Sequence, residues 1–205
     1  QHWSSAASDV YKRQVEDLAK PEIAMLFKDP ENPEKGRLTS CISGWTCYTI
    51  NLVKLKEYGL DDLYTNFDPG SGGALDAAIM AASTKNQPIV TYYWTPTSLM
   101  GKPEVDLVRL TEPAYDESCW SDMMTVVEDI KANGPEVYKP SCACEYKDMA
   151  LTKLATGKFA KEQPAIIDFA NAYTIPTAVV NNMLAYYVDE SGGDMEATAM
   201  HYLET

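Results

Sequence analysis

The fold is decided by the stretch from Arg37 to Gly59, which reads RLTSCISGWTCYTINLVKLKEYG. Its opening residues, 37–42, have the composition of a short strand. The Ser-Gly pair that follows precedes a run with apolar residues at helical spacing, and the final glycine ends that run. The stretch therefore predicts a strand followed by a helix, with Trp45 to Cys47 at the N-terminus of that helix.

The residues that follow repeat the same alternation. Leu63 to Phe67 is expected to form a strand, and the turn Pro69 to Gly73 leads into an alanine-rich helix from Ala74 to about Ser83. Pro88 to Trp94 then has the apolar, β-rich composition of a buried strand. Strands and helices that alternate in this way predict an α/β layer with parallel pairing.

Further elements are predicted on both sides of this layer. A short helix interrupted by Pro21 is expected from Val15 to Phe27. The other predicted elements are strands at 105–110 and 146–154 and helices at 119–132, 159–173, 176–188 and 194–203. The apolar runs are all far shorter than the roughly 20 residues that cross a bilayer, so no membrane span is predicted.

Composition excludes one large class of partner. The chain has 205 residues with 30 acidic and 17 basic side chains, which give a formal net charge of −13. Nucleic acid is therefore not expected as a partner, because its phosphates need a basic protein face. With 45% hydrophobic and 23% charged residues, the composition is that of a soluble globular protein.

The histidines and cysteines narrow the chemistry further. The two histidines, His2 and His201, lie near opposite ends of the chain, so a Ser-His-Asp triad, a Cys-His pair or a zinc site is not expected. The five cysteines contain no C-x-x-C pair, and disulfides are the better interpretation. They are residues 41, 47, 119, 142 and 144. Four can pair, which suits an oxidising compartment, and one thiol is left over. No metal and no cofactor is predicted.

Two tryptophans form the candidate binding site. Trp45 lies at a helix start beside free amide donors, and Trp94 ends a strand, where ligands bind in α/β sheets. Stacked aromatic rings are a common protein site for a quaternary ammonium group, so a cation and an anion could both be bound here. The alternative for Trp45 is a core or lid residue, and Tyr92, Tyr93 and Tyr115 are further ring candidates or core residues.

Two other features are weaker candidates for a functional site. The glycine turn Pro69 to Gly73 could hold a phosphate, but it lacks both nucleotide-binding fingerprints, and a tight connection between strand and helix is favoured. Cys47 could be a thiolate activated by the helix dipole, but no base is expected near it.

Residues 1–14, QHWSSAASDVYKRQ, do not have the pattern of a structural element. They have no apolar period and no signal-peptide h-region. The part SSAASDVYKRQ resembles translated adaptor sequence, so we expect a non-native scar and expect the natural sequence to start near Val15.

Five motifs carry a resemblance to a known family. They are CISGWTC at 41–47, PGSGGAL at 69–75, YYWTP at 92–96, LTEPAYD at 110–116 and IPTAVVNNMLA at 175–185. Together they resemble the substrate-binding proteins of glycine betaine/choline ABC importers, and the resemblance covers roughly Val15 to the C-terminus.

The resemblance implies an α/β fold of the type II periplasmic-binding-protein kind. Residues 37–110 would form one complete ligand-binding lobe, and residues 111–205 would cross back and form the C-terminal share of the other lobe. Residues 15–36 would be the end of a lobe whose N-terminal part is missing, together with the crossover.

The resemblance also implies the roles of particular residues. Trp45 and Trp94 would be two walls of an aromatic box, with Tyr115 as a further ligand-binding residue. The backbone amides of Thr46 and Cys47 would hold the ligand carboxylate, and a Cys41–Cys47 disulfide would shape that turn. Cys119 would pair with Cys142 or Cys144, and both partners stay open.

The implied function is that of a monomeric receptor rather than an enzyme. It would capture glycine betaine, choline or a related quaternary amine in the periplasm or outside the cell and present it to an ABC permease in the inner membrane. Its membrane association would come through the transporter. The main alternative is a thiol-dependent oxidoreductase that uses Cys47 or the pair Cys142 and Cys144. A further alternative is a chain that does not fold by itself.

Overall fold

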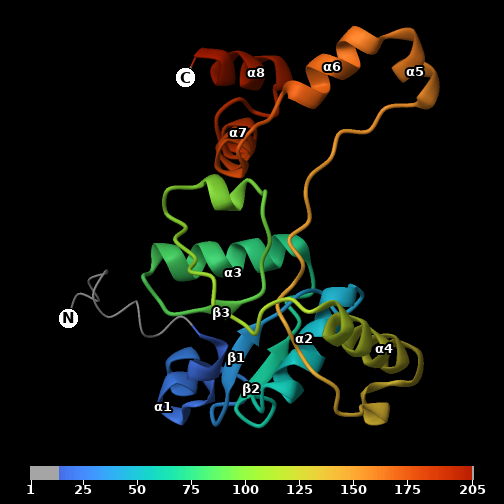
Figure 1. Cartoon of the computed structure of the whole chain (residues 1–205). Helices are drawn as coiled ribbons and strands as arrows, with labels where there is room; N and C mark the ends of the chain where they lie inside the picture. Colours follow the sequence, from blue (N-terminus) through green and yellow to red (C-terminus); the bar gives the residue numbers. More distant parts are fainter. Residues whose placement is uncertain (1–13, 205) are drawn as a thin grey trace. The chain divides into compact units, whose positions relative to one another are not determined.

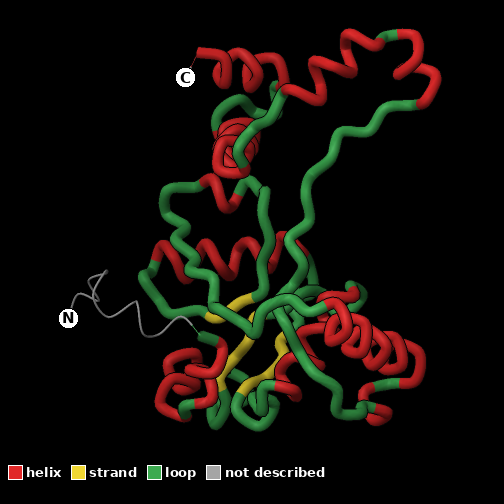
Figure 2. Tube along the Cα trace, viewed as in Figure 1, coloured by secondary structure: helices red, strands yellow, loops and turns green. Residues whose placement is uncertain are grey.

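The computed structural model describes residues 14–204, which form two compact units (Figures 1 and 2). Unit 1 holds residues 14–94 and 103–146, and unit 2 holds residues 95–102 and 147–204. These divisions differ from the predicted lobes at 37–110 and 111–205, which stay a prediction about the two-lobed protein. The predicted scar lies, apart from Gln14, outside the described residues.

Unit 1 is built on a parallel sheet of three strands, β1 (Gly36–Thr39), β2 (Tyr64–Phe67) and β3 (Val90–Thr91), in the order β2-β1-β3. Helix α2 (Thr46–Glu57) connects β1 to β2, and α3 (Gly72–Thr84) connects β2 to β3. The predicted α/β layer with parallel pairing is confirmed. Because crossovers are right-handed, this strand order makes the carboxyl ends of β1 and β3 a topological switch point.

Local signals set the ends of these helices as the sequence predicts. Gly59, just past α2, has a φ of +65°, a conformation that favours glycine at a helix C-terminus. At the start of α3, the Ser71 hydroxyl accepts a hydrogen bond from the Ala74 amide at 3.1 Å. The glycine turn predicted before α3 is thus a connection closed by a side-chain cap.

Two apolar clusters make the core of unit 1. The first lies against the sheet and includes Tyr64 and Val90, together with residues of the N-terminal turns η2 (Val15–Ala19), α1 (Pro21–Ala24) and η3 (Met25–Phe27). The second lies between α2 and α4 (Glu117–Asn133), where Val53, Met123 and Val127 are fully buried. A short turn, η5 (Pro135–Val137), follows α4.

Four strand predictions are wrong in whole or in part, because the strand predicted at 37–42 also ends early, at Thr39. Residues 105–110 and 146–154 are not strands, and β3 covers Val90–Thr91 rather than the expected 88–94. The reason is pairing: β3 pairs with β1 through Val90 and Thr91 alone, and Thr111 forms only an isolated bridge to Gln14. An apolar segment without a neighbouring strand has no ladder to join.

Unit 2 consists of helices. They are η4 (Leu99–Gly101), α5 (Gly157–Glu162), α6 (Pro164–Ala172), α7 (Thr177–Asp189) and α8 (Met195–Glu204). The predicted helix at 159–173 is divided at Gln163, because Pro164 begins a new helix there. The predictions at 176–188 and 194–203 are confirmed. Among residues 14–204, no helix is both long enough and apolar enough to cross a membrane.

Candidate functional site

The two tryptophans singled out in the sequence meet at the switch point of the sheet. Trp45 follows β1 and is the N-cap residue of α2, and Trp94 follows β3. Their ring centroids lie 5.7 Å apart with an interplanar angle of 61°, and the residues are 44% and 38% exposed. Since β1 and β3 are neighbours in the sheet, the fold itself brings these two exposed rings into one corner.

Trp94 is held in place by the residues before it. The Tyr93 ring stacks on the Trp94 ring at 4.8 Å, and the Tyr93 hydroxyl donates to Asp76 Oδ1 on α3 at 2.6 Å. Tyr93 therefore covers one face of Trp94, so a bound cation would have to contact the opposite face.

A row of rings continues from this corner into the second cluster of unit 1. From Trp94 it runs through Tyr92, Tyr146 and Trp120, with centroid separations of 6.1, 5.7 and 5.3 Å. Tyr115 follows Trp120 at 6.1 Å. Tyr115 is thus connected to the tryptophan corner through the rings of Trp120, Tyr146 and Tyr92.

The inner rings of this row are kept neutral. Burial raises the pKa of Tyr92 and, more strongly, the pKa of Tyr146. The tryptophan corner is therefore backed by uncharged aromatic surface. Sequence reasoning did not single out Tyr146 or Trp120, because nothing in the local pattern places either residue near residues 92–94.

The start of α2 lies beside the Trp45 ring. No side chain caps the helix at Trp45, so the first-turn amides, which include those of Thr46 and Cys47, have no side-chain capping oxygen. The Lys131 ammonium lies 3.4 Å from Thr46 Oγ1 and also pairs with Glu128 at 2.9 Å. Lys131 therefore lies near the same end as one member of an ion pair with Glu128, and sequence reasoning did not single it out.

The loop that carries Trp45 is fixed at several points. A disulfide joins Cys41 and Cys47, and Cys41 is fully buried. The Ser43 amide donates to Asp68 Oδ2 at 3.0 Å, and hydrogen bonds from Ser43 and from the Gly70 amide hold the pKa of Asp68 below its ordinary value. A fixed loop presents the helix amides and the Trp45 ring in one defined geometry.

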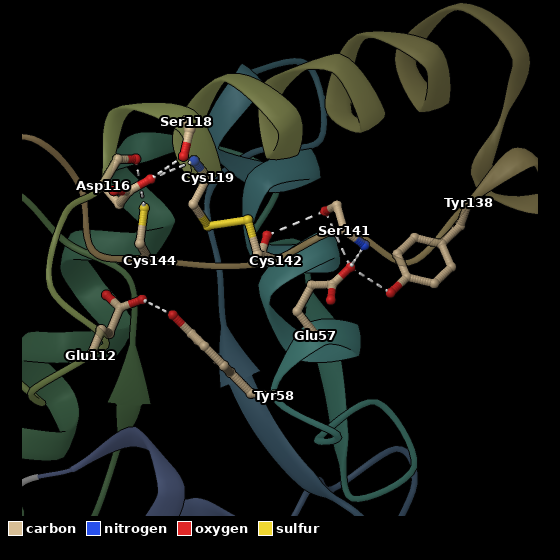
Figure 3. The surroundings of a disulfide bond; sticks show 10 residues. All are labelled: Glu57, Tyr58, Glu112, Asp116, Ser118, Cys119, Tyr138, Ser141, Cys142 and Cys144. Carbon is tan, nitrogen blue, oxygen red and sulfur yellow. Dashed lines mark hydrogen bonds between the residues drawn. A yellow bond between two sulfur atoms is a disulfide. The ribbon is translucent and has the colours of Figure 1, made fainter.

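The second disulfide joins Cys119 to Cys142, and Cys144 is a buried free thiol (Figure 3). The sequence left Cys142 and Cys144 open as partners of Cys119, and in the structure Cys119 is bonded to Cys142. Cys144 is 2% exposed, with its sulfur 3.8 Å from the carbonyl of Asp116. Buried apolar thiols are unreactive, so this arrangement does not favour the oxidoreductase alternative.

The polar groups around this disulfide serve the packing of unit 1. Glu57 accepts hydrogen bonds from the Tyr138 hydroxyl at 2.8 Å and from the Ser141 amide at 2.7 Å (Figure 3). Glu112 accepts one from the Tyr58 hydroxyl at 2.8 Å. In the described part of the chain, no three His, Cys, Asp or Glu residues are placed to hold a metal ion.

Comparison with known proteins points to one family. The family described as the substrate binding domain of an ABC-type glycine betaine transport system matches residues 8–205. The glycine betaine-binding periplasmic protein OusX of Dickeya dadantii (strain 3937) is 32% identical over 101 residues, which make up 48% of this chain and 30% of that protein. The family is one of solute-binding domains and not of enzymes. The chain belongs to the substrate-binding domains of ABC-type glycine betaine transport systems.

Proposed function

We propose that the protein is the receptor of an ABC importer and that it binds a quaternary ammonium solute at the Trp45–Trp94 corner. One observation carries the proposal: two exposed indole rings meet at 5.7 Å beside the uncapped start of α2. The ammonium head would lie against the two rings. A ligand carboxylate would accept hydrogen bonds from the amides of Thr46 and Cys47.

Both halves of this geometry match a betaine. A desolvated cation gains roughly 0.5 to 2 kcal/mol from each ring face that it contacts. The helix start favours an anion through its free amides and the aligned peptide dipoles. A zwitterion such as glycine betaine uses both halves, whereas choline, which lacks a carboxylate, uses only the aromatic half. We therefore place glycine betaine before choline.

The wider assignment follows from the family and the named relative. We propose a type II periplasmic-binding-protein fold in which residues of another lobe complete the aromatic box, with Tyr115 as a further ligand-binding residue. The receptor would act as a monomer in the periplasm or at the cell exterior and deliver its solute to a membrane permease. The formal charge of −13 supports the expectation that nucleic acid is not a partner.

Calorimetric titration of glycine betaine and choline into the full-length protein tests the site. Trp45→Ala and Trp94→Ala should each weaken binding by roughly 2- to 30-fold, and the matching Phe variants should lose less. Phe169→Ala, an exposed ring of unit 2, is the control and should leave affinity unchanged. The proposal fails if the wild type ignores every quaternary amine or if both alanine variants bind like the wild type.

A further inference from the structure

A buried asparagine holds the chain directly after the candidate ligand ring Trp94. Asn181 lies on α7 and is only 9% exposed. Its Oδ1 accepts hydrogen bonds from the Thr95 hydroxyl at 3.0 Å and from the Thr97 amide at 2.9 Å. One oxygen atom therefore fixes both residues through its two lone pairs.

The segment after Trp94, residues 95–102, is also anchored at its C-terminal end. Residues 95–102 belong to unit 2, although the residues on both sides of them belong to unit 1. At Gly101 the backbone packs so closely on α7 that a Cβ there would lie 2.1 Å from the Asn181 carbonyl oxygen. Lys102 then forms an ion pair with Asp189, also on α7. The segment is thus attached along α7 from Thr95 to Lys102.

Packing alone does not account for an asparagine at this position. A buried amide is costly unless its hydrogen bonds are made, and an apolar side chain of the same size would avoid that cost. The two bonds of Oδ1 go to the residues that follow Trp94, and its neighbour on the helix, Asn182, is exposed. The position of Asn181 is therefore explained by what it holds.

We infer that Asn181 is a positioning residue for ligand binding, which acts on the Trp94 ring by fixing Thr95 and Thr97. The inference rests on the proposed function, because it gives Trp94 a ligand to contact. Asn181 itself would not touch the solute. Loss of its acceptor oxygen would release the backbone after Trp94 and broaden the range of ring positions.

A double-mutant cycle on the full-length protein separates positioning from a general structural role. Asn181→Leu keeps the side-chain size and removes the acceptor, and it should weaken glycine betaine binding by roughly fivefold. In a Trp94→Ala background the same change should cost less than about twofold, because the ring through which it acts is gone. Equal losses in both backgrounds would overturn the inference.

Three further variants complete the binding experiment. Asn181→Asp retains an acceptor oxygen and should recover most of the affinity. Thr95→Val removes one of the two hydrogen bonds and should give a smaller loss, which keeps the test decisive if Asn181→Leu does not fold. Asn182→Leu, on the exposed side of the same helix, should bind like the wild type.

A measurement without ligand tests the ring position directly. The tryptophans can be labelled with 5-fluorotryptophan, and single Trp→Phe variants assign the ¹⁹F resonances of Trp45, Trp94 and Trp120. Asn181→Leu and Thr95→Val should shift or broaden the Trp94 resonance and leave that of Trp120 unchanged. A Trp94 resonance that matches the wild type in both variants would contradict the inference. This result stands even if no quaternary amine binds, which would overturn the proposed function alone.

Discussion

Units 1 and 2 use similar helices but bury them differently. In unit 1, α4 covers α2 with Met123 and Val127, which are fully buried. In unit 2, Phe169 is 66% exposed and Met195 is 72% exposed, and Leu99 is the buried large apolar residue among the described residues of that unit. Helices form from a local pattern, but their apolar faces need a second layer to be buried.

This difference in burial indicates that unit 1 contributes most of the stability of the described chain. Unit 1 has a sheet, two apolar clusters and both disulfides, and unit 2 has helices on which several large apolar residues are exposed. Matched substitutions in the two units should therefore have unequal effects on the free energy of unfolding.

Met123→Ala should produce the largest loss of stability. The side chain is fully buried between α2 and α4, so its removal exposes apolar contacts and leaves a cavity. We expect the free energy of unfolding to fall by about 2 to 5 kcal/mol, measured by urea denaturation followed by circular dichroism. A loss below about 1 kcal/mol would show that the cluster is not a packed core.

Removing the Cys119–Cys142 disulfide should rank second. The bridge closes a sequence separation of 23 residues, so the double variant Cys119→Ser/Cys142→Ser should lose about 3 kcal/mol. The Cys41–Cys47 bridge closes a separation of only 6 and should contribute less.

Peptide mapping without reduction provides the control for this pair. It should find Cys41 linked to Cys47, Cys119 linked to Cys142, and Cys144 alkylated only after unfolding. A peptide that links Cys119 to Cys144 would contradict the assignment.

Asp29 should give a smaller, pH-dependent effect. Burial alone would raise the pKa of Asp29, but hydrogen bonds from Arg37 and the Glu31 amide outweigh it and hold the pKa below its ordinary value. A lowered folded pKa means that the stabilisation is present above the unfolded pKa of about 3.9 and is lost as pH falls through the folded pKa.

Asp29→Asn should therefore lower the free energy of unfolding by roughly 1 to 3 kcal/mol at pH 7, with the gap to wild type closing below about pH 4. Glu162→Gln removes an exposed ion pair with Lys158 in unit 2 and should change stability by less than about 0.5 kcal/mol. A gap for Asp29→Asn that stays constant down to pH 2 would rule out this explanation.

Met149→Ala should have the smallest effect. Met149 is 86% exposed in unit 2, so the same chemical change as Met123→Ala should alter the free energy of unfolding by less than about 0.5 kcal/mol. Equal losses for the two methionine variants would remove the contrast between the units.

The local sequence pattern was enough to predict where helices α2 and α3 lie. The Ser-Gly pair before Trp45 and the glycine at 59 place α2 within the predicted range, and the turn at 69–73 leads into α3. Helix periodicity and punctuation act over a few residues, so they can be followed along one chain. The position of Trp45 at the start of α2 follows from the same signals.

Only the tertiary structure decided which segments pair and which side chains meet. The segment at 146–154 alternates enough to predict a strand, yet it has no neighbouring strand and is not one. Cys142 and Cys144 are equivalent in sequence, but Cys142 pairs with Cys119. Asn181 contacts Thr95 across 86 residues, a separation beyond the reach of local pattern. Strand pairing, disulfide partners and buried hydrogen bonds depend on distances that the packed fold alone determines.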